Sequence, residues 1–156
     1  MKSRFGWFAV AGGVVGILAL GPWHGHSEAG TGPATIRITD REVRVTRVDV
    51  GASGTSPGDT EVVSQQLFNL RVTSKPIGHS ELVCTFVDTK RMRVCRGTYV
   101  LPRGKLVVGG SLEYRQFYDL AVLGGTGLYD NARGSVTVTR THRRPVRDLV
   151  VVRLVG

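Results

Sequence analysis

Residues Ser80–Leu101 read SELVCTFVDTKRMRVCRGTYVL. Apolar side chains or glycine recur at every second position on both sides of a polar centre: Leu82, Cys84 and Phe86 before it, and Cys95, Gly97, Tyr99 and Leu101 after it. Alternation with a period of two on either side of a short polar segment is typical of a β-hairpin. The stretch therefore predicts two antiparallel strands, 80–87 and 93–101.

The two cysteines of the chain, Cys84 and Cys95, lie on these two predicted strands. If Thr89-Lys90 form the turn, the cysteines face each other, and the apolar faces of the strands meet in the same register. A disulfide that closes such a loop contributes about 3 kcal/mol to stability. We expect this bridge rather than a catalytic thiol. No nearby His or Cys completes a tetrahedral site, so no metal is expected.

The N-terminus has the pattern of a secretory signal. Lys2 and Arg4 precede an apolar run over 5–20, and Ser27-Glu28-Ala29 supply small residues for cleavage after Ala29. The run of roughly 16 residues is shorter than the roughly 20 that a membrane-spanning helix needs. We therefore expect a signal peptide over 1–29, a secreted location and one mature domain over 30–156. The alternative is an uncleaved N-terminal membrane anchor.

Most of the mature chain predicts strands. The expected ranges are 36–50, 60–73, 80–87, 93–101, 105–114, 117–123, 133–141 and 148–155. Ile36, Ile38, Val43 and Val45 alternate in the first strand, and a type II turn is expected over 56–59. No segment predicts a helix. Eight antiparallel strands hide their edges either as a sandwich or as a closed barrel.

The chain is basic, with 21 Lys and Arg against 12 Asp and Glu and a net charge of +9. Loss of residues 1–29 leaves 19 basic and 11 acidic residues, a net charge of +8. The densest basic cluster is Arg140, His142, Arg143, Arg144 and Arg147. It contains no aromatic residue, so it does not predict nucleic-acid binding. It predicts a solvated loop that attracts anionic surface polymers.

The glycine run Gly124-Gly125-Thr126-Gly127 does not predict a nucleotide site. No Lys-Ser/Thr follows it, a strand rather than a helix comes next, and Asp130 stands where a dinucleotide motif needs its third glycine. We expect these glycines to let the backbone bend between two strands. No cofactor is predicted, and the four histidines complete no Ser-His-Asp set.

Acidic and basic side chains with tyrosines are the remaining candidates for a site. Asp49 ends the first predicted strand, Asp119 lies within 117–123, and Arg133 opens 133–141. A buried carboxyl can act as a general acid, and an arginine can offset negative charge. The alternative is that Asp49 caps a turn, Asp119 faces water and Arg133 pairs with a neighbouring Asp. Five aromatic residues could line a cavity or belong to the core: Tyr99, Tyr114, Phe117, Tyr118 and Tyr129.

The stretch DLAVLGGTGLYDNARG over Asp119–Gly134 resembles the signature of the allene oxide cyclase and dirigent barrel superfamily. In that signature G-G-T-G-x-[FY]-x-x-A-R-G precedes the penultimate strand. The segment Val48–Asp59 resembles the first-strand loop of secreted bacterial members. Cys84, Cys95 and the segment 101–104 fit the same group. The resemblance covers about 36–156.

The resemblance implies an all-β, eight-stranded antiparallel barrel with an apolar cavity, and a homotrimer. Members of the superfamily cyclise an oxylipin epoxide, steer the radical coupling of phenols or close rings. It implies that an early acid, Asp49, and an arginine of the late motif, Arg133, act in this cavity. From the residue pattern we expect Tyr99, Tyr114, Asp119 and Tyr129 to line it.

Two functions are therefore expected. The first is a secreted barrel that binds an apolar or phenolic molecule and steers its cyclisation or stereoselective coupling, as an isomerase-like, cyclase-like or dirigent-like protein. The second is a non-catalytic secreted protein that docks on anionic cell-surface polymers through its basic loop.

Overall fold

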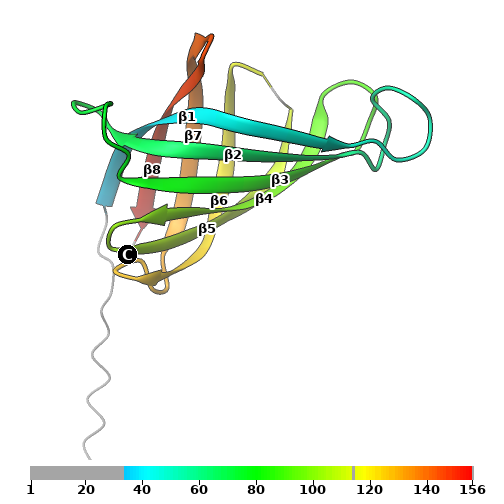
Figure 1. Cartoon of the computed structure of the whole chain (residues 1–156). Helices are drawn as coiled ribbons and strands as arrows, with labels where there is room; N and C mark the ends of the chain where they lie inside the picture. The colour runs from blue at the N-terminus through cyan, green and yellow to red at the C-terminus, as the bar shows by residue number, and fades with distance from the viewer. Residues whose placement is uncertain (1–33, 114, 156) are drawn as a thin grey trace, which may run out of the picture.

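The computed structural model describes residues 34–113 and 115–155, so the predicted signal peptide lies outside the described residues. Eight strands follow one another (Figure 1): β1 (Ala34–Val48), β2 (Thr60–Asn69), β3 (Gly78–Phe86), β4 (Met92–Leu101), β5 (Gly104–Glu113), β6 (Phe117–Gly127), β7 (Arg133–Arg143) and β8 (Val146–Val155). The described residues contain no helix, and thus none long and apolar enough to span a bilayer.

Each strand pairs antiparallel with its neighbours in the sequence, and β1 also pairs with β8, which closes a barrel. At this seam Ile38 lies opposite Val150. Closure leaves no strand with an unpaired edge. The expected eight-stranded antiparallel barrel is confirmed, and the alternative of a sandwich is excluded.

The core fills the interior with side chains from alternate positions. Leu106, Val136, Val150 and Val152 are fully buried. The alternation predicted in the hairpin is confirmed, because Leu82, Cys84 and Phe86 are buried while the residues between them are exposed. Cys84 and Cys95 lie opposite each other on β3 and β4 and form the expected disulfide.

The structure corrects the expected pattern of β1. Ile38 is buried, but Val43 and Val45 are 52% and 42% exposed. The pairing of β1 with β2 shifts between Glu42 and Arg44, which inserts an extra residue into β1. Such a bulge interrupts the two-residue alternation, so the apolar pattern cannot be extended through it.

The glycine run was expected to separate two strands, and this expectation is wrong. Gly124–Gly127 continue β6 and pair with the first residues of β5. A Cβ on Gly125 would lie 2.2 Å from the carbonyl oxygen of Tyr129 and 2.6 Å from that of Lys105. Glycine is needed there for the close approach of two backbones rather than for a bend.

The connections at the two ends of the barrel differ. At the end that we call the open end lie the connections β1–β2, β3–β4, β5–β6 and β7–β8. Figure 1 shows the β1–β2 loop and the β7–β8 hairpin projecting away from the C-terminus. The β1–β2 loop contains the predicted turn at 56–59, with Gly58 at a φ of 97°. Ala34 and Leu154 pair at the opposite end.

Candidate functional site

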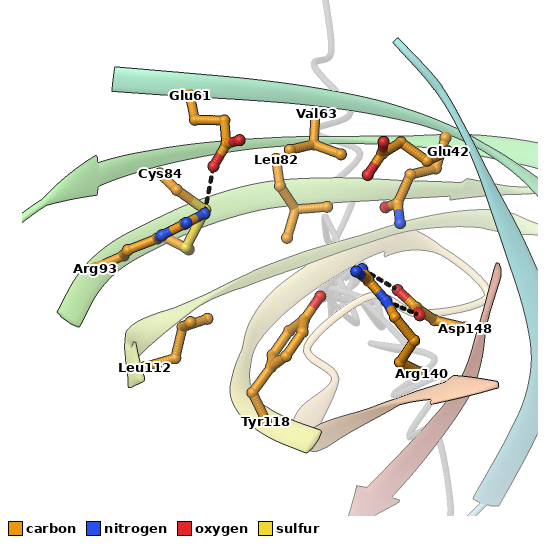
Figure 2. Close-up of a pocket in the computed structure, with 12 residues that line it drawn as sticks. Glu42, Glu61, Val63, Leu82, Cys84, Arg93, Leu112, Tyr118, Arg140 and Asp148 are labelled. Atoms are coloured by element: carbon orange, nitrogen blue, oxygen red, sulfur yellow. Dashed lines mark hydrogen bonds and ion pairs between the residues drawn. A yellow bond between two sulfur atoms is a disulfide. The ribbon is translucent and has the colours of Figure 1, made fainter. Parts of the chain in front are cut away.

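A cavity of about 70 Å³ lies inside the open end of the barrel (Figure 2). All eight strands contribute to its lining, which consists of Glu42, Glu61, Val63, Gln65, Leu82, Cys84, Arg93, Cys95, Leu112, Tyr118, Arg140 and Asp148. An apolar cavity of about 150 Å³ can enclose a benzene ring. The cavity is therefore too small to enclose a whole ring and has room for part of a small organic molecule.

One side of the cavity is apolar and bordered by a salt bridge. Leu82, Leu112 and the disulfide form the apolar surface. Beside it the Glu61 carboxylate pairs with the guanidinium of Arg93, which lies 4.2 Å from the centre of the Phe86 ring. This wall suits a ring or an alkyl chain, because its only charges are paired.

The opposite side is polar. Figure 2 shows the side chains of Glu42, Tyr118 and Arg140 directed toward the centre of the cavity, from β1, β6 and β7. Arg140 Nε donates a hydrogen bond to Asp148 Oδ1 at 3.0 Å, and its Nη2 lies 3.4 Å from Asp148 Oδ2. Burial raises the pKa of the Glu42 carboxyl, and the positive charge of Arg140 opposes this shift.

Behind this wall lies a buried polar network that joins β1, β2, β3 and β8. Gln65 Nε2 donates to Asp40 Oδ2 at 2.8 Å, and the Ser80 hydroxyl donates to Gln65 Oε1 at 2.9 Å. The backbone N–H of Asp148 donates to Asp40 Oδ1 at 3.2 Å. A satisfied network of this kind fixes its members in one arrangement. It therefore holds Asp148, and through it Arg140, in place.

Asp40 is the most perturbed acid of the network. Its burial, followed by the negative charge of Asp148, raises the pKa of its carboxyl to about 8. Burial also raises the pKa of Tyr99, and the charges of Asp40 and Asp148 add to this effect. The buried Tyr99 hydroxyl has no hydrogen-bond partner among the described residues. At neutral pH the network thus contains a protonated carboxyl, that of Asp40.

The structure does not bring Asp49 and Arg133 together. Asp49 follows β1 at the open end, where its carboxylate accepts a hydrogen bond from the Gly54 N–H at 3.4 Å. Arg133 starts β7 opposite Val155, at the other end of the barrel. Both are exposed, and Arg133 Nη1 donates to the carbonyl oxygens of Leu123 and Ala132. Their catalytic role stays a prediction, and neither residue lines the cavity.

The other predicted cavity residues have separate positions. Asp119 is exposed, and its Oδ1 accepts a hydrogen bond from the Thr137 hydroxyl. Tyr129 is buried in the turn between β6 and β7, beside Gly104 and Gly125. Tyr99 lies in the core behind the polar wall, and Tyr114 lies outside the described residues.

Sequence reasoning missed most of the polar residues that do face the cavity. Tyr118 was among the aromatic residues expected to line a cavity, and it does so, but Glu42, Arg140 and Asp148 were not among the predicted site residues. Arg140 had been assigned to a solvated basic loop; the structure places it in β7, in a salt bridge with the buried Asp148. The two-residue alternation could have identified Arg140, because Arg140 occupies the next inward position after the buried Val136 and Val138.

The arrangement combines a proton donor or acceptor, Glu42, with a cation, Arg140, and a phenol, Tyr118, around one small space. These groups can bind a ligand oxygen, exchange a proton with it and stabilise negative charge on it. Within residues 34–113 and 115–155, no three His, Cys, Asp or Glu side chains gather to hold a metal ion.

No family model matches the sequence, and no curated protein matches it either. Solved structures do match its fold. A pterocarpan synthase dirigent protein superposes with a TM-score of 0.59 at 13% identity, over 78% of this chain and 82% of that one. A Diels–Alderase from Streptomyces koyangensis superposes with a TM-score of 0.63 at 17% identity. The chain has the barrel fold of dirigent proteins and cyclases.

The matches differ in how much of each solved structure they cover. The match to the Diels–Alderase covers 79% of this chain and 64% of that one, so the cyclase has additional chain outside the shared barrel. A pyocyanin demethylase has the same dirigent and cyclase barrel, with a TM-score of 0.68 at 24% identity over 78% of this chain and 99% of that one. The expected barrel superfamily is confirmed at the level of fold.

Proposed function

We propose that this protein binds a small apolar or phenolic molecule in the cavity at its open end and steers the cyclisation or coupling of that molecule. The observation that supports this proposal best is the cavity itself, in which an apolar wall faces the polar wall of Glu42, Tyr118 and Arg140. The shared fold with dirigent proteins and a Diels–Alderase supports the same class of function.

In the proposed mechanism a ligand oxygen binds between Arg140 and Tyr118, and the ring packs on Leu82 and Leu112. Arg140 stabilises negative charge that develops on the oxygen. Glu42, whose raised pKa keeps it protonated to higher pH than an ordinary glutamate, exchanges a proton with the ligand. Fixing one conformer of the ligand in this way lowers the entropic barrier to one product.

A neutral phenol tests this proposal. We expect 4-ethylphenol, followed by NMR titration, to shift the methyl signals of Leu82 and Leu112. Glu42→Gln and Arg140→Lys should weaken its binding several-fold, because each removes a polar contact. Asp49→Asn and Arg133→Ala serve as controls, since neither residue lines the cavity, and should leave binding unchanged. Binding without any shift at Leu82 and Leu112 would exclude the cavity as the ligand site.

Steering is tested with the same phenol and an added one-electron oxidant. Each phenol loses one electron to the oxidant and one proton to water, and two phenoxyl radicals then join through one new bond. In free solution this gives a mixture of dimers. The protein should change the ratio of the dimers, and Arg140→Lys should restore the ratio of free solution. An unchanged ratio at saturating protein would contradict steering.

A second function is supported by the exposed arginines of the β7–β8 hairpin, Arg143 and Arg144. In this proposal the protein docks on anionic cell-surface polymers without catalysis. Binding to a polyanion such as heparin that weakens steeply with salt, together with an unchanged dimer ratio, would favour it over the first function.

Export and assembly also remain proposals. The Cys84–Cys95 disulfide supports export, because such bridges persist in oxidising compartments. A homotrimer would need an apolar outer surface, and Val83, Val94 and Leu123 are 45%, 52% and 43% exposed around one shallow groove on the outside of the barrel. Light scattering measures the assembly, and Val94→Asp should shift a trimer toward monomer.

A further inference from the structure

The open end of the barrel is strongly cationic. A groove of about 520 Å³, which we call the basic groove, is lined by Lys90, Arg91, Arg93, Arg115, Gln116, Arg140 and Arg143. Six of these seven residues are cations, and none is an acid. The connections β3–β4 and β5–β6 and the end of β7 thus line the groove with positive charge.

The basic groove adjoins the cavity. Arg93 and Arg140 line both spaces, and in the cavity each pairs with a carboxylate, Arg93 with Glu61 and Arg140 with Asp148. The two arginines therefore form the border between the groove and the cavity.

Several cations of the groove have no acidic counterpart. Arg115 is not one of them, because its Nη2 lies 2.8 Å from both carboxylate oxygens of Glu113. Lys90, Arg91 and Arg143 are exposed and form no ion pair with the described residues. The backbone of the β3–β4 turn is fixed, because the N–H of Lys90 donates to Asp88 Oδ1 at 2.8 Å. Positive charge is therefore held at the rim without being neutralised there.

The interior has the opposite character. Glu42, Glu61 and Asp148 line the cavity, and Asp40 lies directly behind it. A full negative charge deep in the cavity would lie near these carboxyls, where Arg93 and Arg140 are already paired with Glu61 and Asp148, whereas the same charge at the rim would lie among mostly cationic side chains. The distribution of charge thus sets an orientation for a ligand, with its negative end in the basic groove and a neutral ring directed into the cavity.

We propose that the ligand is a small aromatic carboxylate, whose ring enters the cavity and whose carboxylate binds in the basic groove. This inference rests on the proposed function and adds the charge of its substrate. The guanidinium groups of Arg91 and Arg143 can bind a carboxylate with two parallel hydrogen bonds each. The field of the rim also raises the local concentration of anions and their rate of entry.

Two probes that differ only in charge test the inference: 4-hydroxyphenylacetate and its neutral amide, 4-hydroxyphenylacetamide. We expect the carboxylate to bind about tenfold more tightly, since it gains charge-assisted hydrogen bonds from two or more cations. NMR should show shifts for both probes at Leu82 and Leu112. The preference for the carboxylate should shrink several-fold between about 20 mM and about 300 mM salt, because the groove is exposed and screened.

Two double variants test whether the preference for the carboxylate depends on the arginines of the groove or only on the net charge of the protein. Arg91→Gln/Arg143→Gln should abolish most of the preference for the carboxylate and leave binding of the amide unchanged. Arg71→Gln/Arg103→Gln removes the same charge from exposed residues at the opposite end, and should keep the preference.

The outcomes distinguish this inference from the proposed function. Equal affinities for the acid and the amide, with shifts at Leu82 and Leu112, would overturn the anionic substrate and keep the cavity as a ligand site. Shifts from the carboxylate that stop at the basic groove would also overturn it, and would favour docking on an anionic polymer. Binding of neither probe would overturn both proposals.

Discussion

Asp40 and Asp148 lie directly opposite each other across the β1–β8 seam that closes the barrel. The N–H of Asp148 donates to Asp40 Oδ1, and both side chains are about 1% exposed. Two like charges cannot both be buried at this distance without a large cost. The pair is tolerated because Asp40 keeps its proton and because Arg140 neutralises Asp148.

The protonated state of Asp40 predicts how stability depends on pH. The pKa of the Asp40 carboxyl is about 8 in the folded barrel, whereas the ordinary pKa of an aspartic acid is 3.8. Between these values the folded state binds more protons, so this stabilisation is full below about pH 4 and is lost as the pH rises to about 8, with a slope of at most about 1.4 kcal/mol per pH unit.

Asp40→Asn should remove this dependence. The variant is expected to lose less stability than the wild type between about pH 5 and pH 8, and to melt at the higher temperature at about pH 9. Asp119→Asn, on the exposed outer face, should follow the wild type. Parallel curves for wild type and Asp40→Asn would show that Asp40 is ionised in the folded protein.

Arg140→Met should destabilise the barrel by about 3 kcal/mol, because Asp148 then stays buried without its cation. The double variant Arg140→Met/Asp148→Leu should regain most of that loss, since no isolated charge remains. Urea unfolding of all three proteins measures the coupling. Arg153→Met is the control, and should change stability by less than about 0.5 kcal/mol because Arg153 is exposed. A double variant that is no more stable than Arg140→Met would contradict the coupling.

Reduction of the disulfide should cost about 3 kcal/mol, the stabilisation expected for a closed loop of this length. The chain has two cysteines, so a reducing agent acts on this bridge alone. Cys84→Ala/Cys95→Ala should show the same fall in its urea midpoint, and adding the reducing agent to this variant should change nothing further. A midpoint unaffected by reduction of the wild type would contradict the prediction.

Gly125 and Gly110 provide a matched pair of glycines. Gly125→Ala should destabilise the barrel by more than about 2 kcal/mol, because its Cβ would overlap two carbonyl oxygens that belong to the backbone. At Gly110 the nearest atom to a Cβ lies 3.6 Å away, so Gly110→Ala should be neutral or stabilising by up to about 1 kcal/mol. Thermal unfolding distinguishes the two, and equal losses would contradict the steric argument.

The sequence allowed the barrel to be predicted because its inward positions are mostly apolar. Leu82, Cys84 and Phe86 predict a strand by themselves, and the cysteines fix its register with the next one. The prediction failed at Val43 and Val45, where a bulge changes the phase. A bulge leaves no local pattern in the sequence, since it arises from pairing with a distant strand.

The polar site was missed for a related reason. Polar residues at inward positions resemble strand ends or outward positions, so they were not predicted to face the interior. Each nevertheless shares the phase of buried neighbours: Asp40 with Ile36 and Ile38, Ser80 with Leu82 and Cys84, and Asp148 with Val150, Val152 and Leu154. Phase alone suggests that they point inward. It does not show that Asp40 and Asp148 meet, because that contact joins the two ends of the chain.

The pairing of Ala34 with Leu154 places both ends of the described chain at the end of the barrel opposite the open end, where the proposed ligand would enter. A tether attached before β1 or after β8 would hold the barrel with its entrance directed away from the point of attachment. A cleaved and an anchored form would therefore expose the same entrance to solvent, and a fusion at either end would leave it unobstructed.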